Sequence, residues 1–254
     1  MIIDYNKIPK AEAIPEADSM IETFRAIGYT LETAVADIID NSITAGAKNI
    51  WITRTWDGDN SSICIKDDGH GMNSDECIQA MRPGSKNPNE LRDEKDLGRF
   101  GLGLKTASFS QCRRLTLLSK RKGQKSVYWT WDLDFVNKEN KWQVLSWCPK
   151  SYLKSLDNVE SGTCVIWTDM DRVIPKGTME EDDLSKQDFY NQLDKLKRHL
   201  RMTFHRFIED GDISLLWGDE ELSPWNPFCL DEPKTQPYSD DDVSFNKEIV
   251  AQLQ

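Results

Sequence analysis

The sequence predicts an α/β protein, and three patterns lead to that fold class. Residues 49–55 and 61–66 alternate apolar and polar side chains, as half-buried antiparallel strands do. Apolar residues recur at helical spacing within residues 30–44, and residues 183–208 read as a long amphipathic helix. The chain has 254 residues, which suits one globular core with a short appendage.

Two helices are predicted at the start of this core. The first covers residues 18–26 and is interrupted by Gly28. Thr30 is a suitable N-cap for the second, which runs to about Thr44, because its hydroxyl can accept a hydrogen bond from an unpaired backbone N–H. The residues expected to face the core are Leu31, Ala34, Val35, Ile38 and Ile39.

The remaining elements follow in order. Asp57-Gly58 lies between the first two strands and suits a hairpin turn. A short helix is expected at residues 74–81, and the polar segment 82–96 is interpreted as a long functional loop. Next come a glycine-rich segment and helix at 98–110, strands at 112–121, 125–135 and 162–168, the long helix at 183–208, and a closing hairpin from 212 to about 227.

Composition narrows the classes of function. The formal net charge of −11 argues against a grip on nucleic acid by this chain alone, because such affinity rests on neutralising phosphates. Binding of nucleic acid is therefore expected only through a full-length assembly of the protein. No apolar run approaches the roughly 20 residues of a membrane helix. No signal peptide is recognised, so a cytoplasmic location is predicted. Residues 1–228 are predicted to form the domain, and 229–254 an acidic linker or the start of a following domain.

Asp37 and Asn41 form the first group with chemical potential. They are four residues apart on the predicted helix and therefore share one face. A carboxylate beside an amide oxygen can orient a water molecule and can ligate a hard cation such as Mg²⁺. Taken alone, the pair also fits an ordinary solvated helix face.

A second group follows the strand at residues 61–66, in the run Asp67-Asp68-Gly69-His70-Gly71-Met72. A carboxylate at the end of a strand can accept a hydrogen bond from an exocyclic amine. Glycines just beyond it allow a planar base to approach the backbone closely. The alternative interpretation is an ordinary glycine turn.

The third group is the glycine-rich run Gly98-Arg99-Phe100-Gly101-Leu102-Gly103-Leu104-Lys105-Thr106. Glycines that lead into a helix present backbone N–H groups and the positive end of the helix dipole, which suit phosphate. Leu104 interrupts the Walker A pattern, and the glycine order reverses that of the Rossmann motif. Both of these commoner nucleotide folds are therefore disfavoured.

The three groups, in this order and with a long loop between the second and third, resemble the GHKL ATPases. That superfamily includes gyrase, heat-shock chaperones, histidine kinases and MutL, and the chain looks most like its MORC and MutL-like hydrolases. The resemblance covers roughly Met20 to Pro227. It implies the Bergerat fold, an α/β two-layer sandwich in which a mixed, mainly antiparallel sheet carries helices on one face.

The resemblance also implies the parts of a nucleotide site. Asp37 corresponds to the general base, Asn41 to the Mg²⁺ ligand and Asp67 to the carboxylate that reads the adenine amine. The other implied contacts are Gly69, Gly71 and Met72 around the base, Ser85 and Lys86 early in the lid (residues 82–97), Gly98, Gly101, Leu102, Gly103 and Lys105 at the phosphates, and Thr163, in Ser161-Gly162-Thr163, beside an adenine-bound water.

The function implied by this resemblance is Mg²⁺-dependent ATP binding and hydrolysis that closes the lid and drives homodimerisation. Prokaryotic ATPases of this kind are associated with DNA transactions and with defence against phage. Two alternatives stay open. One is an ATP-binding switch without significant turnover, and the other is a domain similar to a histidine or protein kinase.

One position departs from the family pattern. Its hydrolases usually carry glutamate four residues before the asparagine, whereas this sequence has Asp37. The aspartate side chain is one methylene shorter, so the carboxylate or the water must shift. Misplacement by about 1 Å can cost on the order of 10²-fold in rate. Slow hydrolysis is therefore expected.

Overall fold

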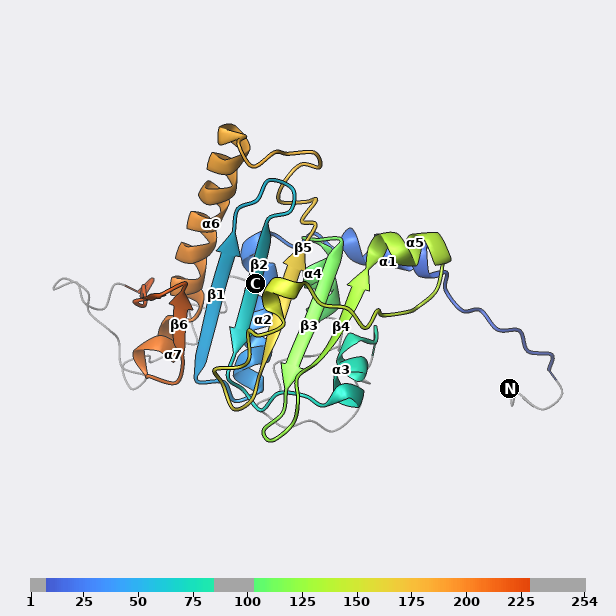
Figure 1. Cartoon of the computed structure of the whole chain (residues 1–254), viewed down its shortest axis with the longest axis horizontal. Helices are drawn as coiled ribbons and strands as arrows, with labels where there is room; N and C mark the ends of the chain where they lie inside the picture. The colour runs from blue at the N-terminus through green and yellow to red at the C-terminus, as the bar shows by residue number, and fades with distance from the viewer. Residues whose placement is uncertain (1–7, 85–102, 229–254) are drawn as a thin grey trace, which may run out of the picture.

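A mixed β-sheet forms the centre of the computed structural model, which describes residues 8–84 and 103–228 (Figure 1). Within these ranges the strand order is β4-β3-β5-β2-β1-β6-β7, and β1 with β6 is the parallel pair among antiparallel neighbours. The strands are β1 (Asn49–Thr55), β2 (Ser62–Asp67), β3 (Arg114–Lys120), β4 (Val127–Asp132), β5 (Gly162–Thr168), β6 (Ser214–Trp217) and β7 (Glu220–Glu221).

The α-helices form a second layer, with α2 packed against both α4 and α6 behind the sheet in Figure 1. This arrangement confirms the predicted sandwich of a mainly antiparallel sheet and a helical layer. No helix in the described part of the chain is long and apolar enough to span a membrane. The helices are α1 (Ala17–Arg25), α2 (Leu31–Thr44), α3 (Ser74–Met81), α4 (Gly103–Phe109), α5 (Leu133–Glu139), α6 (Asp183–Thr203) and α7 (His205–Glu209).

Helix α2 forms as its sequence pattern predicts. The Thr30 side chain accepts a hydrogen bond from the backbone N–H of Thr33, and the Thr33 hydroxyl accepts one from the Thr30 N–H. This reciprocal pair satisfies two backbone donors that a helix start would leave unpaired. The five apolar side chains predicted to face the core are all buried. Helix α2 therefore turns one apolar side to the core and leaves Asp37 and Asn41 on another side.

The opposite face of the sheet is also covered, by the segment that contains the short helix η1 (Lys150–Tyr152). Alternate residues of a strand point to opposite faces, so β2 sends Ile63 and Ile65 to the helical layer and Cys64 to this second cluster. As a result β2 is buried along almost its whole length, and the expectation that it is half-buried is wrong. The buried members of the second cluster are Cys64, Leu118, Cys148, Leu156, Cys164 and Ile166.

Two predicted boundaries differ from the structure. Strand β4 ends at Asp132, whose side chain accepts hydrogen bonds from the N–H groups of Asp134 and Phe135 and thereby starts α5. The helix predicted at 183–208 is divided at Phe204, where the chain leaves helical geometry while the phenyl ring stays buried. In both places a local contact ends an element that the apolar pattern alone would continue.

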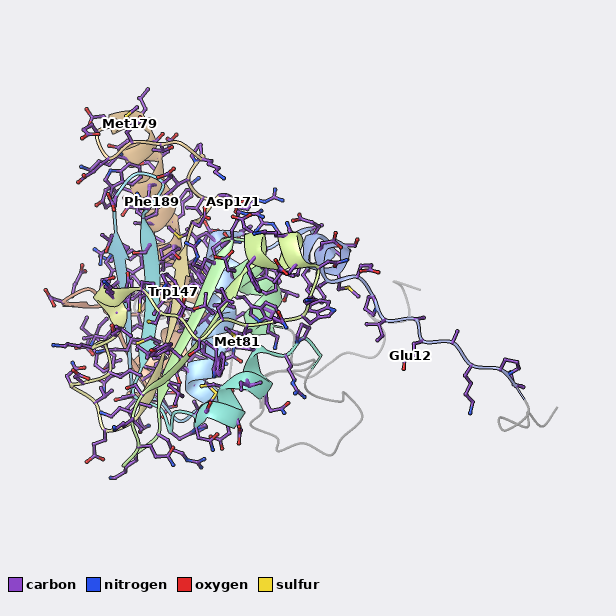
Figure 2. All side chains as sticks on the ribbon, turned by 45° about the vertical axis from the view of Figure 1, so that its right-hand side comes forward. Glu12, Met81, Trp147, Asp171, Met179 and Phe189 are labelled. Atoms are coloured by element: carbon purple, nitrogen blue, oxygen red, sulfur yellow. The ribbon has the colours of Figure 1, made fainter. Side chains whose placement is uncertain are left out.

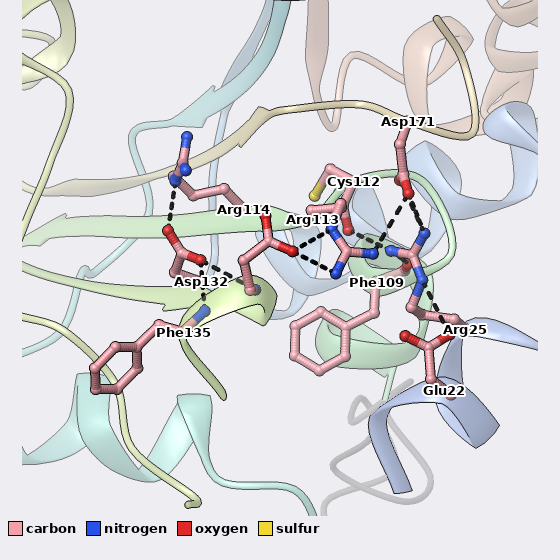
Figure 3. Close-up of polar contacts among 10 residues, drawn as sticks. Glu22, Arg25, Phe109, Cys112, Arg113, Arg114, Asp132, Phe135 and Asp171 are labelled. Carbon is pink, nitrogen blue, oxygen red and sulfur yellow. Dashed lines mark hydrogen bonds and ion pairs between the residues drawn. The ribbon is translucent and has the colours of Figure 1, made fainter. Parts of the chain in front are cut away.

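A buried arginine fixes how α1 enters the helical layer (Figure 3). The Arg25 guanidinium donates to the carbonyl oxygens of Phe109 at 2.9 Å and Cys112 at 3.0 Å. One guanidinium nitrogen, Nη2, also contacts both carboxylate oxygens of Asp171, at 2.7 and 2.8 Å. These contacts join the end of α1 to the end of α4. They also anchor the short segment that leads from α1 into α2.

Helix α3 is held at both ends by hydrogen bonds, and its last turn packs into the core. Met81, labelled in Figure 2, lies in the last turn of the helix and is buried. The Trp131 indole N–H donates to the Met81 carbonyl oxygen at 3.0 Å. Asn73 caps the start of the helix and exchanges hydrogen bonds with Glu76. Helix α3 is therefore fixed at both ends beside the turn that follows β2.

Candidate functional site

A buried carboxylate lies where α2, β2 and β5 meet. Asp67 at the end of β2 is 5% exposed. Its Oδ1 accepts hydrogen bonds from the backbone N–H groups of Gly69 at 2.9 Å and Thr163 at 3.2 Å. Its Oδ2 accepts one from the Ser42 hydroxyl of α2 at 2.9 Å. Three donors from separate elements thus hold this acid in one orientation.

The turn after Asp67 can be built only with glycine at two positions. Gly71 has φ +63°, and a Cβ at this position would lie 1.9 Å from the carbonyl oxygen of Lys120. A Cβ on Gly69 would approach the Asp67 Oδ1 to 3.1 Å and the Ala45 side chain to 2.9 Å. Backbone therefore approaches backbone and carboxylate closely at this turn. The predicted approach of a planar base to these glycines stays a prediction.

A hydroxyl network joins this turn to β3 and β5. The Met72 N–H donates to the Ser119 Oγ at 2.8 Å. The Ser119 hydroxyl lies 2.9 Å from the Thr163 hydroxyl and 3.1 Å from the Gly162 carbonyl oxygen. Met72 and Thr163, two of the residues predicted to surround the base, are thus brought together with Asp67.

Burial changes the acidity of Asp67. Loss of solvent raises its pKa from the ordinary value of 3.8 to about 6, and the hydrogen bonds from Gly69, Ser42 and Thr163 act in the opposite direction. The acid therefore binds a proton more readily in the folded chain than in the unfolded one.

The contribution of Asp67 to stability is expected to depend on pH. Because the pKa is raised on folding, this contribution is fully present below about pH 4 and is lost as the pH rises to about 6. A shift of about two units corresponds to roughly 3 kcal/mol in the free energy of unfolding. Urea unfolding from pH 4 to pH 7 should show the stability difference between the unaltered protein and Asp67→Asn falling by that order.

The asparagine amide suits this comparison, because its nitrogen can donate to the Ser42 hydroxyl while its oxygen still accepts from the backbone. The exposed residue Asp194 on α6 supplies a matched control. The difference in the free energy of unfolding between the unaltered protein and Asp194→Asn should stay constant from pH 4 to pH 7. A constant or rising difference for Asp67→Asn would contradict the raised pKa.

The second acid, Asp37, is half-buried on α2 and has a defined donor. The Tyr29 phenol donates to its Oδ2 at 2.6 Å. At the start of α4, a Cβ on Gly103 would lie 3.6 Å from the same oxygen, so the backbone there approaches Asp37 closely. Asp40, one turn along, has its pKa raised to about 6, first by burial and then by the negative charge of Asp37.

Asn41 lies beside Asp37 and is exposed. Its amide nitrogen donates to the Asp37 backbone carbonyl at 2.8 Å. Because the nitrogen is used inside the helix, the amide oxygen is the atom that can ligate a cation. An amide oxygen is a hard donor of the kind that Mg²⁺ accepts, so this residue fits the predicted metal.

Helix α2 connects the two parts of the site. Asp37 and Asn41 share one side of the helix, and Ser42, the next residue, contacts Asp67. Asp37 and Ser42 are five residues apart, which corresponds to a rise of roughly 7.5 Å along the helix axis. The predicted base and the predicted metal ligand therefore lie on the helix whose Ser42 contacts the predicted adenine-reading acid in the sheet.

Lys105 has a different environment from these acids. Its side chain is 2% exposed, and its ammonium group donates to the Ala80 carbonyl oxygen at 2.9 Å in the last turn of α3. Its role at the phosphates stays a prediction. The other predicted lid and phosphate residues, Ser85, Lys86, Gly98, Gly101 and Leu102, lie outside the described residues.

Three residues of the site are missed by sequence reasoning. Ser42 directly follows Asn41, and its place next to the predicted metal ligand is the available signal. Ser119 directly follows Leu117 and Leu118 in β3, and a polar residue after an apolar pair could have drawn attention to it. Tyr29 precedes the N-cap of α2, and nothing in the local pattern links its phenol to Asp37.

Comparison with known protein families gives a match over the part of the chain that contains these residues. A family model described as "Histidine kinase-, DNA gyrase B-, and HSP90-like ATPase" matches residues 29–163. That range begins at Tyr29 and ends at Thr163, so it includes all the polar contacts of the site described above.

Similar relatives match shorter segments. The chain is 31% identical over 105 residues to the chaperone protein HtpG of Rickettsia canadensis, with 37% of this chain and 16% of the relative covered. It is 30% identical over 91 residues to the ATPase morc-1 of Caenorhabditis elegans, with 36% and 10% covered. It is 36% identical over 89 residues to the DNA mismatch repair protein MutL of Buchnera aphidicola, with 34% and 15% covered. The chain thus matches only a small part of the length of each relative.

Proposed function

Since the chain belongs to the histidine kinase-, DNA gyrase B- and HSP90-like ATPases, we propose that it binds ATP with Mg²⁺ beside α2 and hydrolyses it slowly. One observation carries the proposal. Ser42 of α2 holds the buried Asp67 carboxylate, and the same helix carries Asp37 and Asn41, five residues and one residue before Ser42. Helix α2 therefore both holds Asp67, the proposed adenine-binding acid, and carries Asp37, the proposed general base.

Adenine recognition is proposed to rest on Asp67. Its Oδ2 accepts from Ser42 and has a further lone pair, which can accept from the exocyclic amine of adenine. Close packing of protein backbone against Gly69 and Gly71 fixes the turn that follows Asp67, and this turn would form one wall of the adenine pocket. The half-buried Met72 side chain would pack on the base, and Thr163 would support a bridging water.

The proposed metal ligand is Asn41. Its exposed amide oxygen, with phosphate oxygens and waters, makes the kind of oxygen ligand set that Mg²⁺ takes in phosphate-bound sites. When bound, Mg²⁺ neutralises the charge that develops on the phosphates during transfer.

The hydrolytic step is proposed to use Asp37. A water oxygen forms a bond to the γ-phosphorus while the bond from that phosphorus to the β–γ bridging oxygen breaks, and ADP carries away the bond electrons. The Asp37 carboxylate orients the water and accepts its proton. The Tyr29 hydrogen bond occupies Oδ2 from one side. Oδ1 is then the oxygen proposed to face the water.

Wider roles of the domain also stay proposals. An ATP-dependent homodimer is expected. A task in DNA transactions is proposed from the relative named as a DNA mismatch repair protein, and a task in phage defence is proposed from the family resemblance alone. Residues 1–228 are proposed as the domain, and the segment after them as a linker or the start of another domain. Gel filtration with and without a non-hydrolysable ATP analogue tests the dimer directly.

The main test measures binding and turnover separately. Mg²⁺-ATP is expected to raise the melting temperature, and EDTA is expected to remove most of that rise. Phosphate release with protein in excess over ATP reports turnover. Binding without phosphate release would favour the switch without turnover, and radiolabel from the γ-phosphate on protein would favour a kinase-like domain.

Asn41→Ala is expected to weaken Mg²⁺-ATP binding by about 10- to 100-fold, because a ligand of the metal is removed. Asn137→Ala on the exposed side of α5 is the matched control and should bind as the unaltered protein does. Calorimetric titration of both variants gives the comparison. Equal affinities would remove Asn41 from the proposed metal site.

A further inference from the structure

A tyrosine outside the predicted site holds the candidate general base. The Tyr29 hydroxyl lies 2.6 Å from the Asp37 Oδ2, the short distance typical of a hydrogen bond to a carboxylate. The phenol is half-buried. Burial, then the hydrogen bond to Asp37 and the charge of that acid, raise the pKa of Tyr29, while the side chain of Thr106 lowers it. Tyr29 therefore stays protonated and acts as a donor.

We propose that Tyr29 is a positioning residue, which fixes the short Asp37 side chain so that its second oxygen can take the proton of the attacking water. This inference rests on the proposed hydrolysis and adds to it. An aspartate carboxylate reaches one methylene less far than a glutamate and can rotate about its own bonds. A donor on Oδ2 removes that freedom and selects one orientation for Oδ1.

The support for Tyr29 is built into the fold. Its backbone carbonyl accepts from the Gln111 side-chain amide at 3.2 Å, and that amide also donates to the Ser110 hydroxyl at 2.9 Å. The neighbouring Thr30 caps α2. The buried Arg25 fixes the other end of the same short segment (Figure 3). The backbone at Tyr29 is thus anchored on both sides, and the exposed residues 26–28 are only a short link between these anchors.

The surroundings of Asp37 give this donor a specific task. Asp40, three residues after Asp37 on α2, adds a second carboxyl group on a neighbouring part of the helix surface. Two carboxylates near each other repel when both are ionised, and this repulsion acts on the orientation of the Asp37 carboxylate. A fixed hydroxyl on Oδ2 opposes that movement. Loss of the Tyr29 hydroxyl is therefore expected to lower the rate of ATP hydrolysis by a measurable amount.

The test is a set of four proteins: the unaltered chain, Tyr29→Phe, Asp37→Asn and the double variant. Tyr29→Phe is expected to lower kcat by about 10-fold or more, with KM for ATP and the ATP dissociation constant within about twofold of the unaltered chain. In the Asp37→Asn background, the same change is expected to have no further effect on the residual rate, because the oxygen it positions no longer takes a proton.

Tyr152→Phe is the matched control. The Tyr152 hydroxyl is also hydrogen-bonded, to the Ser62 hydroxyl at 2.7 Å, but it belongs to the cluster on the opposite face of the sheet. This variant should keep the kcat of the unaltered chain. It therefore separates a positioning effect on Asp37 from the general cost of removing a buried phenol oxygen.

The outcomes distinguish failure of the Tyr29 positioning role from failure of the proposed hydrolytic function. If Asp37→Asn abolishes hydrolysis and Tyr29→Phe leaves kcat unchanged, the positioning role is overturned and the proposed function stands. If Tyr29→Phe raises KM in place of lowering kcat, or lowers the rate equally in both backgrounds, its role is structural and the inference is again overturned. If Asp37→Asn keeps the full rate, the proposed base is wrong and the inference falls with it.

Discussion

Replacing Asp37 with asparagine is expected to lower the rate of ATP hydrolysis by about 100-fold or more, because a positioned general base contributes about that much. ATP binding is expected to change little. Asparagine has the same shape, and its amide oxygen can still accept from the Tyr29 hydroxyl that lies 2.6 Å from the Asp37 Oδ2. What is lost is the ability to accept a proton near neutral pH. Phosphate release under single-turnover conditions and a calorimetric ATP titration measure the two quantities.

The exposed Asp194 on α6 again gives the control, and Asp194→Asn should hydrolyse ATP at the rate of the unaltered protein. A variant at Asp37 that keeps its full rate would transfer the base role to another group. One that loses ATP binding together with hydrolysis would assign Asp37 to holding the ligand.

Replacing Gly71 with alanine is expected to destabilise the domain by more than about 3 kcal/mol, because the new Cβ overlaps backbone that cannot move alone. The Cβ would lie 1.9 Å from the Lys120 carbonyl oxygen and 2.6 Å from its carbon, at the end of β3. Relief requires the turn to move, and Met72 is tied to Ser119 just beyond it. ATP affinity should therefore fall as well. Urea unfolding and a calorimetric titration test both effects.

Gly46 offers a control with similar backbone geometry and free space. Its φ is +73°, and a Cβ there would meet no atom within 4 Å. Gly46→Ala should cost only about 1–2 kcal/mol, the ordinary penalty of this conformation for an L-residue. The difference between the two variants isolates the overlap with Lys120. Equal losses for both would show that the turn yields readily and that Gly71 is not required by close packing.

The order and type of most elements follow from local patterns. Helix α2 is predicted closely, because its cap and its apolar spacing are properties of neighbouring residues. The burial of β2 on both faces could not be predicted from local patterns, because it depends on the segment around η1, which is distant from β2 along the chain. The end of β4 at Asp132 depends on a capping contact that competes with the strand pattern.

The site divides in the same way. That Asp37 and Asn41 share a side of α2 was determined by the sequence, since helical geometry relates residues four apart wherever the helix lies. Asp67 and the spaced glycines after it could also be identified from the sequence, because they are close neighbours along the chain. The tertiary structure alone decided that Ser42 reaches Asp67 across 25 positions, that Thr163 reaches it across 96, and that the Tyr29 phenol donates to Asp37. Hydrogen bonds between distant segments exist only once the helical layer has packed on the sheet at one angle and one height, and no local pattern carries that information.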